Sequence, residues 1–121
     1  MNTEKTHGLT LKCAQGCVGP GWSLLVEEAW TAVHTAGGYL ADLKEKYGSM
    51  MISYSIPSAG SREVARQVRE MERRSAWTCE ACGQRGCIQD IGGWYKALCR
   101  THHRRAVAGE TFSQLSSDAF R

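Results

Sequence analysis

The sequence contains no long hydrophobic segment. No run approaches the ~18 consecutive apolar residues that a membrane-spanning helix needs, and the start, MNTEKTHGLTLK, lacks the apolar core of a signal peptide. We therefore expect a soluble, cytoplasmic protein. The chain also has no internal repeat, low-complexity tract or long linker, so residues 1–121 are expected to form one domain with one modest core.

Without a signal sequence, the six cysteines are not expected to reach an oxidising compartment. Disulfides are rare in the reducing cytosol, where closely spaced cysteines more often bind metal. Metal ligation is therefore the better interpretation of these residues than a disulfide framework.

Arginine is absent from the first half of the chain. Residues 1–60 carry four Lys and five Asp or Glu, whereas residues 61–121 carry eleven Lys and Arg, ten of them Arg, against seven Asp and Glu. The excess positive charge thus lies in the second half, where an anionic partner is expected.

The pattern before the cysteine pairs predicts a helix, a hairpin and a second helix. Residues 1–21 are expected to be an irregular arm with a short extended piece over 9–11. Within residues 22–76, Ser23 is a candidate cap for a helix ending at about His34. Alternation over residues 50–56 predicts a strand that pairs with residues 39–44.

The second helix is predicted to be capped by Ser61 and to extend to about Ala76. At about 100° per residue its two sides differ in chemistry. One arc holds Val64, Val68, Met71 and Ser75. The opposite side holds Arg62, Arg66, Arg69 and Arg73. We therefore expect the helix to pack on one side and to display arginines on the other.

Two cysteine-containing pairs in residues 77–106 have the spacing of a structural zinc site. Cys79 and Cys82 form a Cys-x2-Cys knuckle, and Cys99 and His102 follow at i and i+3 of a predicted helix start. Four thiolate or imidazole ligands, supplied as two close pairs, are typical of such sites. The spacing predicts one structural Zn²⁺ held by these four residues.

Strands are predicted between the two pairs, at Cys87 to Asp90 and Trp94 to Leu98. The order knuckle, hairpin and helix resembles a treble-clef zinc finger. The expected fold is therefore α+β, with a helix, a β-hairpin, a second helix and a C-terminal treble-clef-like module.

Several other residues remain alternatives for metal binding. His103 could replace His102, and Cys87 could replace one of the predicted cysteines. Cys13 and Cys17, with His7 and an unused Cys87, could form a second site, although their spacing is loose. The role of the tail, residues 107–121, is also open: Phe112, Leu115 and Phe120 could dock on the core or on a second chain.

Several motifs together resemble a family of small zinc-binding proteins of phages and proteobacteria. They are Gly21-Trp22, Lys44-Glu45-Lys46-Tyr47-Gly48, Cys79-Glu80-Ala81-Cys82-Gly83 with Gly86, Gly92-Gly93-Trp94, Leu98-Cys99 and His102. The likeness spans about residues 17–103 and implies the fold, the zinc ligands and a phage or mobile-element setting. Ser49 and Cys87 depart from the family pattern.

These observations favour a binding protein over an enzyme. Four protein ligands leave a zinc ion no open position for water, and the hairpin from Cys87 to Leu98 has no histidine to activate water. We expect a phage accessory protein that inhibits a host protein by stoichiometric binding, as anti-CRISPR proteins do. That partner could itself be a nucleic-acid-binding complex.

The alternative is a regulatory zinc-finger protein that binds nucleic acid. Two groups of arginines would then contact phosphates. They are Arg62, Arg66, Arg69 and Arg73 on the second helix, and Arg100, Arg104 and Arg105 after the second ligand pair.

Overall fold

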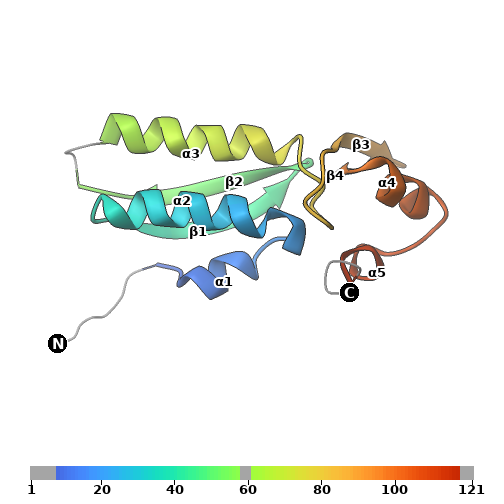
Figure 1. Ribbon diagram of the computed structural model, residues 1–121, viewed down its shortest axis with the longest axis horizontal. Coiled ribbons are helices and arrows are strands. Elements are labelled where there is room, and N and C mark those ends of the chain that lie inside the picture. The colour runs from blue at the N-terminus through green and yellow to red at the C-terminus, as the bar shows by residue number, and fades with distance from the viewer. Residues whose placement is uncertain (1–7, 58–60, 118–121) are drawn as a thin grey trace.

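The computed structural model describes residues 8–57 and 61–117 and has the α+β architecture that the sequence predicts (Figure 1). The elements in chain order are α1 (Leu11–Gln15), a 3₁₀ turn η1 (Pro20–Trp22), α2 (Ser23–Thr35), β1 (Tyr39–Lys46), β2 (Ser49–Ser55), α3 (Ser61–Ser75), β3 (Cys87–Ile91), β4 (Trp94–Leu98), α4 (Arg100–Val107) and α5 (Phe112–Ser116). Across the described ranges, none of these helices is long and apolar enough to cross a membrane.

The described part of residues 1–21 is not an irregular arm, which corrects that prediction. Thr10 caps α1 by accepting a hydrogen bond from the Cys13 N–H (3.1 Å). Leu9 is tied to the neighbouring elements, since its N–H donates to the Leu40 carbonyl (2.8 Å) and its carbonyl accepts from the Trp30 indole (3.0 Å). These partners lie far along the chain, so local composition did not reveal them; residues 1–7 lie outside the described ranges.

Helix α2 begins without the predicted side-chain cap. Ser23 is its first helical residue, and the position before it is Trp22, which makes no capping hydrogen bond. The chain enters α2 directly from the η1 turn, so the turn replaces the cap. At the other end, the Gly37 and Gly38 N–H groups donate to His34 and Val33 carbonyls, which ends the helix where the sequence predicts.

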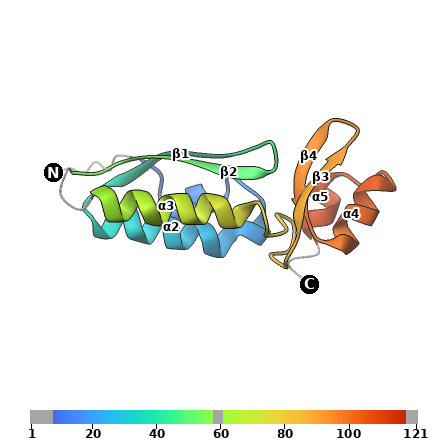
Figure 2. The same ribbon diagram turned by 90° about the horizontal axis from the view of Figure 1, so that it is seen from above.

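The first hairpin follows the predicted alternation. Strands β1 and β2 pair antiparallel around a two-residue turn at Tyr47 and Gly48, both with positive φ. Met50 and Ile52 are buried on the face covered by α2 and α3, whereas Met51 is exposed. Figure 2 shows the two helices side by side in one layer and the hairpin in the other.

Helix α3 packs through the predicted residues. Val64, Val68, Met71 and Ser75 are all buried. The Ser75 hydroxyl accepts a hydrogen bond from the Met50 N–H (2.8 Å) and donates to the Glu72 carbonyl (2.6 Å), so its burial leaves no polar group unpaired. Ser61 is the first described residue of the helix, and the predicted loop 58–60 lies outside the described ranges.

In the described residues the core consists of two hydrophobic clusters, whereas one was expected. The larger lies among α1, α2, α3 and the first hairpin, and we call residues 8–75 the helix–hairpin lobe. The smaller gathers Cys79, Ala81, Leu98 and Cys99 with Ala106 and Leu115, and we call residues 77–117 the metal-binding lobe. Ala97 of β4 belongs to the larger cluster, so the two lobes share a packed boundary.

The boundary between the lobes is also hydrogen-bonded. The indole of the fully buried Trp22 donates to the Thr78 carbonyl (2.8 Å), and the Gly21 N–H donates to the Glu80 carbonyl (2.7 Å). The chain is therefore one domain with two parts, as Figure 1 shows.

The described part of the tail docks on the chain's own core. Leu115 of α5 is fully buried in the smaller cluster, and Phe112 packs against it. A capping box between Thr111 and Gln114 fixes the start of α5. Phe120 lies outside the described residues.

Candidate metal centre and binding surfaces

The first ligand pair is held by a tight turn directly after α3. The Cys79 N–H donates to the Gln84 carbonyl (2.7 Å), and the Gly83 N–H donates to the Cys79 carbonyl (2.8 Å). Gly83 has φ of +86°, a conformation that side chains disfavour, and it lets the backbone fold back beneath the two sulfurs. Cys79 and Cys82 consequently face the same point.

The second ligand pair is positioned by the start of α4. Cys99 follows β4 and is the N-cap of α4, where its sulfur accepts from the His102 N–H (3.5 Å). The i, i+3 spacing then places the His102 ring over the first helical turn. The hairpin of β3 and β4 carries this pair back to the knuckle, which gives the predicted order of knuckle, hairpin and helix.

The four predicted residues form a compact group whose ligand atoms all lie within 4.8 Å of one another. The His102 Nδ1 lies 3.3 Å from the Cys99 sulfur and 3.5 Å from the Cys79 sulfur, and the Cys82 and Cys99 sulfurs are 3.9 Å apart. Tetrahedral coordination with Zn–S near 2.3 Å implies ligand separations of roughly 3.5–3.8 Å. These three separations are close to those around one tetrahedral ion, and Cys79, Cys82 and Cys99 are free thiols.

Burial disfavours ionisation of the thiols of Cys79 and Cys82 when no metal is bound. Burial raises the pKa of the Cys79 thiol to about 12, and it also raises the pKa of Cys82. Both thiols are therefore protonated at neutral pH when no ion is bound. A metal ion would displace these protons, so its affinity should rise with pH.

The alternative ligands lie outside this group. His103 is half-buried and is not part of the cluster, and Cys87 accepts a hydrogen bond from the Gln89 amide (3.1 Å). Cys13 and Cys17 are exposed, and the Cys17 thiol donates to the Cys13 carbonyl (3.2 Å). Among residues 8–57 and 61–117 no second metal-ligand cluster is found; His7 lies outside them.

Glu80 is the residue of this region that sequence reasoning missed. It is buried between the two ligands of the knuckle, where its carboxylate accepts from the Gly19 N–H (2.9 Å) and the Lys96 ammonium (3.1 Å). Lys96 also lies 3.4 Å from Glu45. Because Gly19 and Glu45 are remote in sequence, no local pattern marks Glu80 as the residue that joins the knuckle to the helix–hairpin lobe.

The predicted arginine surface is partly neutralised by neighbouring glutamates. Arg66 pairs with Glu63 (2.5 Å) and Arg73 with Glu70 (2.6 Å), both at i, i+3 on α3. Arg105 pairs with Glu110 (2.6 Å). In the described part of the chain no ion pair is found for four further exposed arginines, which are Arg62, Arg69, Arg100 and Arg104.

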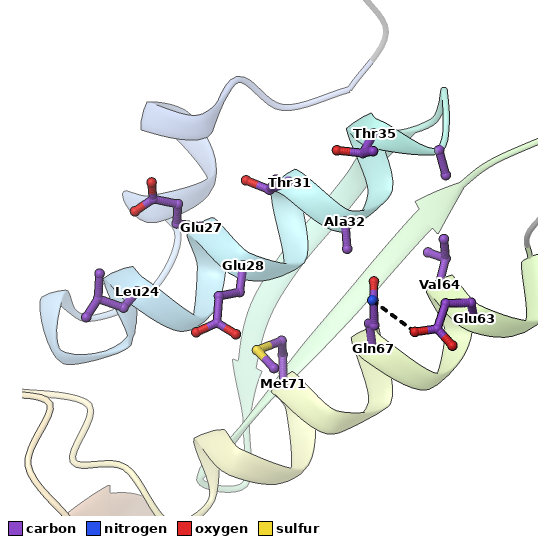
Figure 3. Close-up of a pocket in the computed structure, with 11 residues that line it drawn as sticks. Leu24, Glu27, Glu28, Thr31, Ala32, Thr35, Glu63, Val64, Gln67 and Met71 are labelled. Atoms are coloured by element: carbon purple, nitrogen blue, oxygen red, sulfur yellow. Dashed lines mark hydrogen bonds between the residues drawn. The ribbon is translucent and has the colours of Figure 1, made fainter.

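An apolar groove of about 810 Å³ runs between α2 and α3 on the side away from the sheet (Figure 3). The apolar residues that line it are Leu24, Ala32, Ala36, Val64 and Met71. Three carboxylates, Glu27, Glu28 and Glu63, also line it, and its lining includes no Lys or Arg. Leu24 is 74% exposed, although it is a large apolar side chain.

Comparison of the chain with protein-family models, curated proteins and solved structures finds no match.

Proposed function

We propose that this chain is a small zinc-stabilised accessory protein of a phage or mobile element that inhibits a host protein by stoichiometric binding, in the manner of anti-CRISPR proteins. The observation that carries the binding function is the apolar groove between α2 and α3. The phage setting rests on the family resemblance of the motifs in residues 17–103. Thiol ligation of a metal fits a reducing compartment, so we place the protein in the host cytoplasm.

The metal in this proposal is one Zn²⁺ with a structural role. Three sulfurs and one imidazole nitrogen are a typical donor set for structural zinc. Four protein ligands close the coordination sphere, which leaves no position for a reacting water. We therefore propose no enzymatic activity for this centre; the ion would stabilise the metal-binding lobe.

Replacing His102 with alanine should weaken zinc binding far more than replacing His103. The His102 Nδ1 lies within 3.5 Å of two ligand sulfurs, and loss of a direct ligand should exceed the ~10–100-fold cost of losing a ligand's hydrogen-bond partner. His103→Ala should change the binding free energy by only about 0.5 kcal/mol, as surface changes do. Competition with a colorimetric chelator measures both; equal losses would show that the fourth ligand is wrongly assigned.

The groove suits an amphipathic helix with basic flanks. Contiguous apolar surface of this kind marks interaction sites, and helices dock in such grooves through residues at i, i+3, i+4 and i+7. Small residues such as Ala32 and Thr31 on α2 permit close approach of a third helix, while the exposed Leu24 provides apolar contact. The three carboxylates favour lysine or arginine on the partner.

A charge placed at Leu24 should abolish partner binding. Leu24→Glu should weaken the affinity for the partner by at least about 30-fold, as expected for a large apolar anchor that becomes buried on binding, without unfolding the exposed site. The matched control is Val107→Glu on α4, because Val107 is also apolar and exposed (64%) but lies outside the groove.

Affinity capture from nuclease-treated host extract should identify a protein bound by the wild type and by Val107→Glu but lost with Leu24→Glu. Titration of the purified host protein with this chain should then give one-to-one stoichiometry. A peptide with the sequence of the partner's docking helix should compete with the host protein for the groove. Equal binding by both variants would place the interface elsewhere.

Nucleic-acid binding through the α3 arginines remains the second candidate, favoured by Arg62 and Arg69, which have no ion pair within residues 8–57 and 61–117. Each phosphate contact would contribute a slope of about −0.9 to the dependence of log affinity on log salt. Because Glu63, Glu70 and Glu72 lie among these arginines on α3 and salt screens exposed charges, we expect weak duplex binding at about 150 mM salt. Submicromolar binding to a duplex, lost in an Arg66→Ala/Arg69→Ala variant that remains folded, would favour this candidate over the protein-binding proposal.

A further inference from the structure

A second concave site lies where the end of α3 meets the metal knuckle. It has a volume of about 530 Å³ and is lined by Arg73, Arg74, Trp77, Thr78 and Arg85. It shares no lining residue with the α2–α3 groove. Trp77 is 55% exposed there, whereas Trp22 is fully buried in the core. A tryptophan kept at the surface among three arginines is not explained by packing.

The walls of this site are held by backbone hydrogen bonds of the knuckle. The Trp77 carbonyl accepts from the Gly86 N–H (2.9 Å), and Thr78 forms an isolated bridge with Arg85. Trp77 follows α3, and its N–H donates to the Arg74 carbonyl (3.0 Å). Because the same turn carries Cys79 and Cys82, the position of Arg85 relative to Trp77 depends on the folded knuckle.

The arginines of this site are available to bind an anion. Arg85 is exposed and has no ion pair among the described residues. Arg73 pairs with Glu70 and Arg74 with Glu28 (3.3 Å), but both pairs are exposed. Exposed pairs contribute little free energy, so a phosphate could replace the glutamates as partner.

An exposed indole next to several guanidinium groups matches the chemistry of a nucleotide. Bases stack on aromatic faces whatever their identity, and arginine contacts the adjoining phosphate bidentately. A base within a duplex is already stacked and does not present a free face. We propose that Trp77, with Arg73, Arg74 and Arg85, binds one nucleotide unit of single-stranded nucleic acid. This inference is independent of the α2–α3 groove, so either can fail alone.

The test is binding of a labelled oligo(dT) of about 12 nucleotides, a length within the site sizes of single-strand binders, to the full zinc-loaded chain. Fluorescence anisotropy should show binding that Trp77→Ala weakens at least about fivefold and that Trp77→Phe partly restores. The matched control is Trp94→Ala, because Trp94 is also partly exposed (38%) but lies in β4. Arg85→Ala should make the salt slope shallower by about one phosphate contact.

Competition experiments distinguish the ligands that could each supply an aromatic ring and a phosphate. Competition by unlabelled oligo(dT), and at higher concentration by the free mononucleotide dTMP, but not by a duplex, would support a single-stranded ligand. Zinc content and thermal melting of Trp77→Ala should match the wild type, so that lost binding reflects lost stacking. No oligonucleotide binding at low salt, equal losses from Trp77→Ala and Trp94→Ala, or binding only of a phosphotyrosine peptide would overturn the proposal.

Discussion

Replacing Cys99 with serine should release the metal and unfold the metal-binding lobe. The Cys99 sulfur is both a member of the ligand group and the N-cap acceptor of α4, so the substitution removes two local restraints. Structural zinc contributes on the order of 10 kcal/mol of apparent binding energy, comparable to the whole stability of a domain. The smaller hydrophobic cluster has only a few apolar side chains to offset that loss. Cys82→Ser should have a similar effect.

Metal analysis and amide hydrogen exchange would measure this result. We expect about one zinc per folded wild-type chain, and a chelator should reproduce the loss of protection over residues 77–106. The helix–hairpin lobe should keep more of its protection, because its larger cluster takes only Ala97 from the other lobe. The matched control is Cys87→Ser, since Cys87 is half-buried and outside the ligand group. Well under one zinc per folded wild-type chain would contradict the proposal.

Replacing Gly21 with alanine should cost about 3 kcal/mol or more of unfolding free energy. A Cβ at Gly21 would lie under 3.0 Å from three backbone atoms of the knuckle, in Cys79, Cys82 and Gly83. Backbone atoms that are held by their own hydrogen bonds cannot rotate away, so the added methyl group exceeds the usual overpacking cost of about 1–3 kcal/mol. The same displacement should weaken metal binding, because Cys79 and Cys82 belong to the potential metal site.

Chemical denaturation with parallel zinc titration would test the Gly21 prediction. Gly16→Ala is the matched control, since a Cβ at Gly16 would lie 3.5 Å from its nearest neighbours, an ordinary contact, and its φ of −76° suits any residue. That control should change stability by no more than about 0.5–1 kcal/mol. If Gly21→Ala folded as stably as Gly16→Ala, the contact between η1 and the knuckle would be wrong.

The elements that could be predicted from the sequence are those whose signals are local. Helix α3 shows a 3.6-residue alternation of apolar and charged positions, and strand β2 alternates with period two. Helix α1 could not be predicted in this way, because its start depends on the Thr10 cap and on contacts of Leu9 with Leu40 and Trp30. The cap predicted at Ser23 failed for a similar reason: the η1 turn before it supplies the helix start.

The sequence by itself identified the four residues that gather at the potential metal site. A Cys-x2-Cys turn and an i, i+3 pair at a helix start are short-range geometries, so spacing alone predicts which four side chains can meet around one ion. Only the tertiary structure decided what surrounds that site. The burial of Glu80, the contact of Gly21 with the knuckle, the α2–α3 groove and the site at Trp77 each join segments far apart along the chain. Their geometry follows from how the two lobes pack, and no local pattern records that packing.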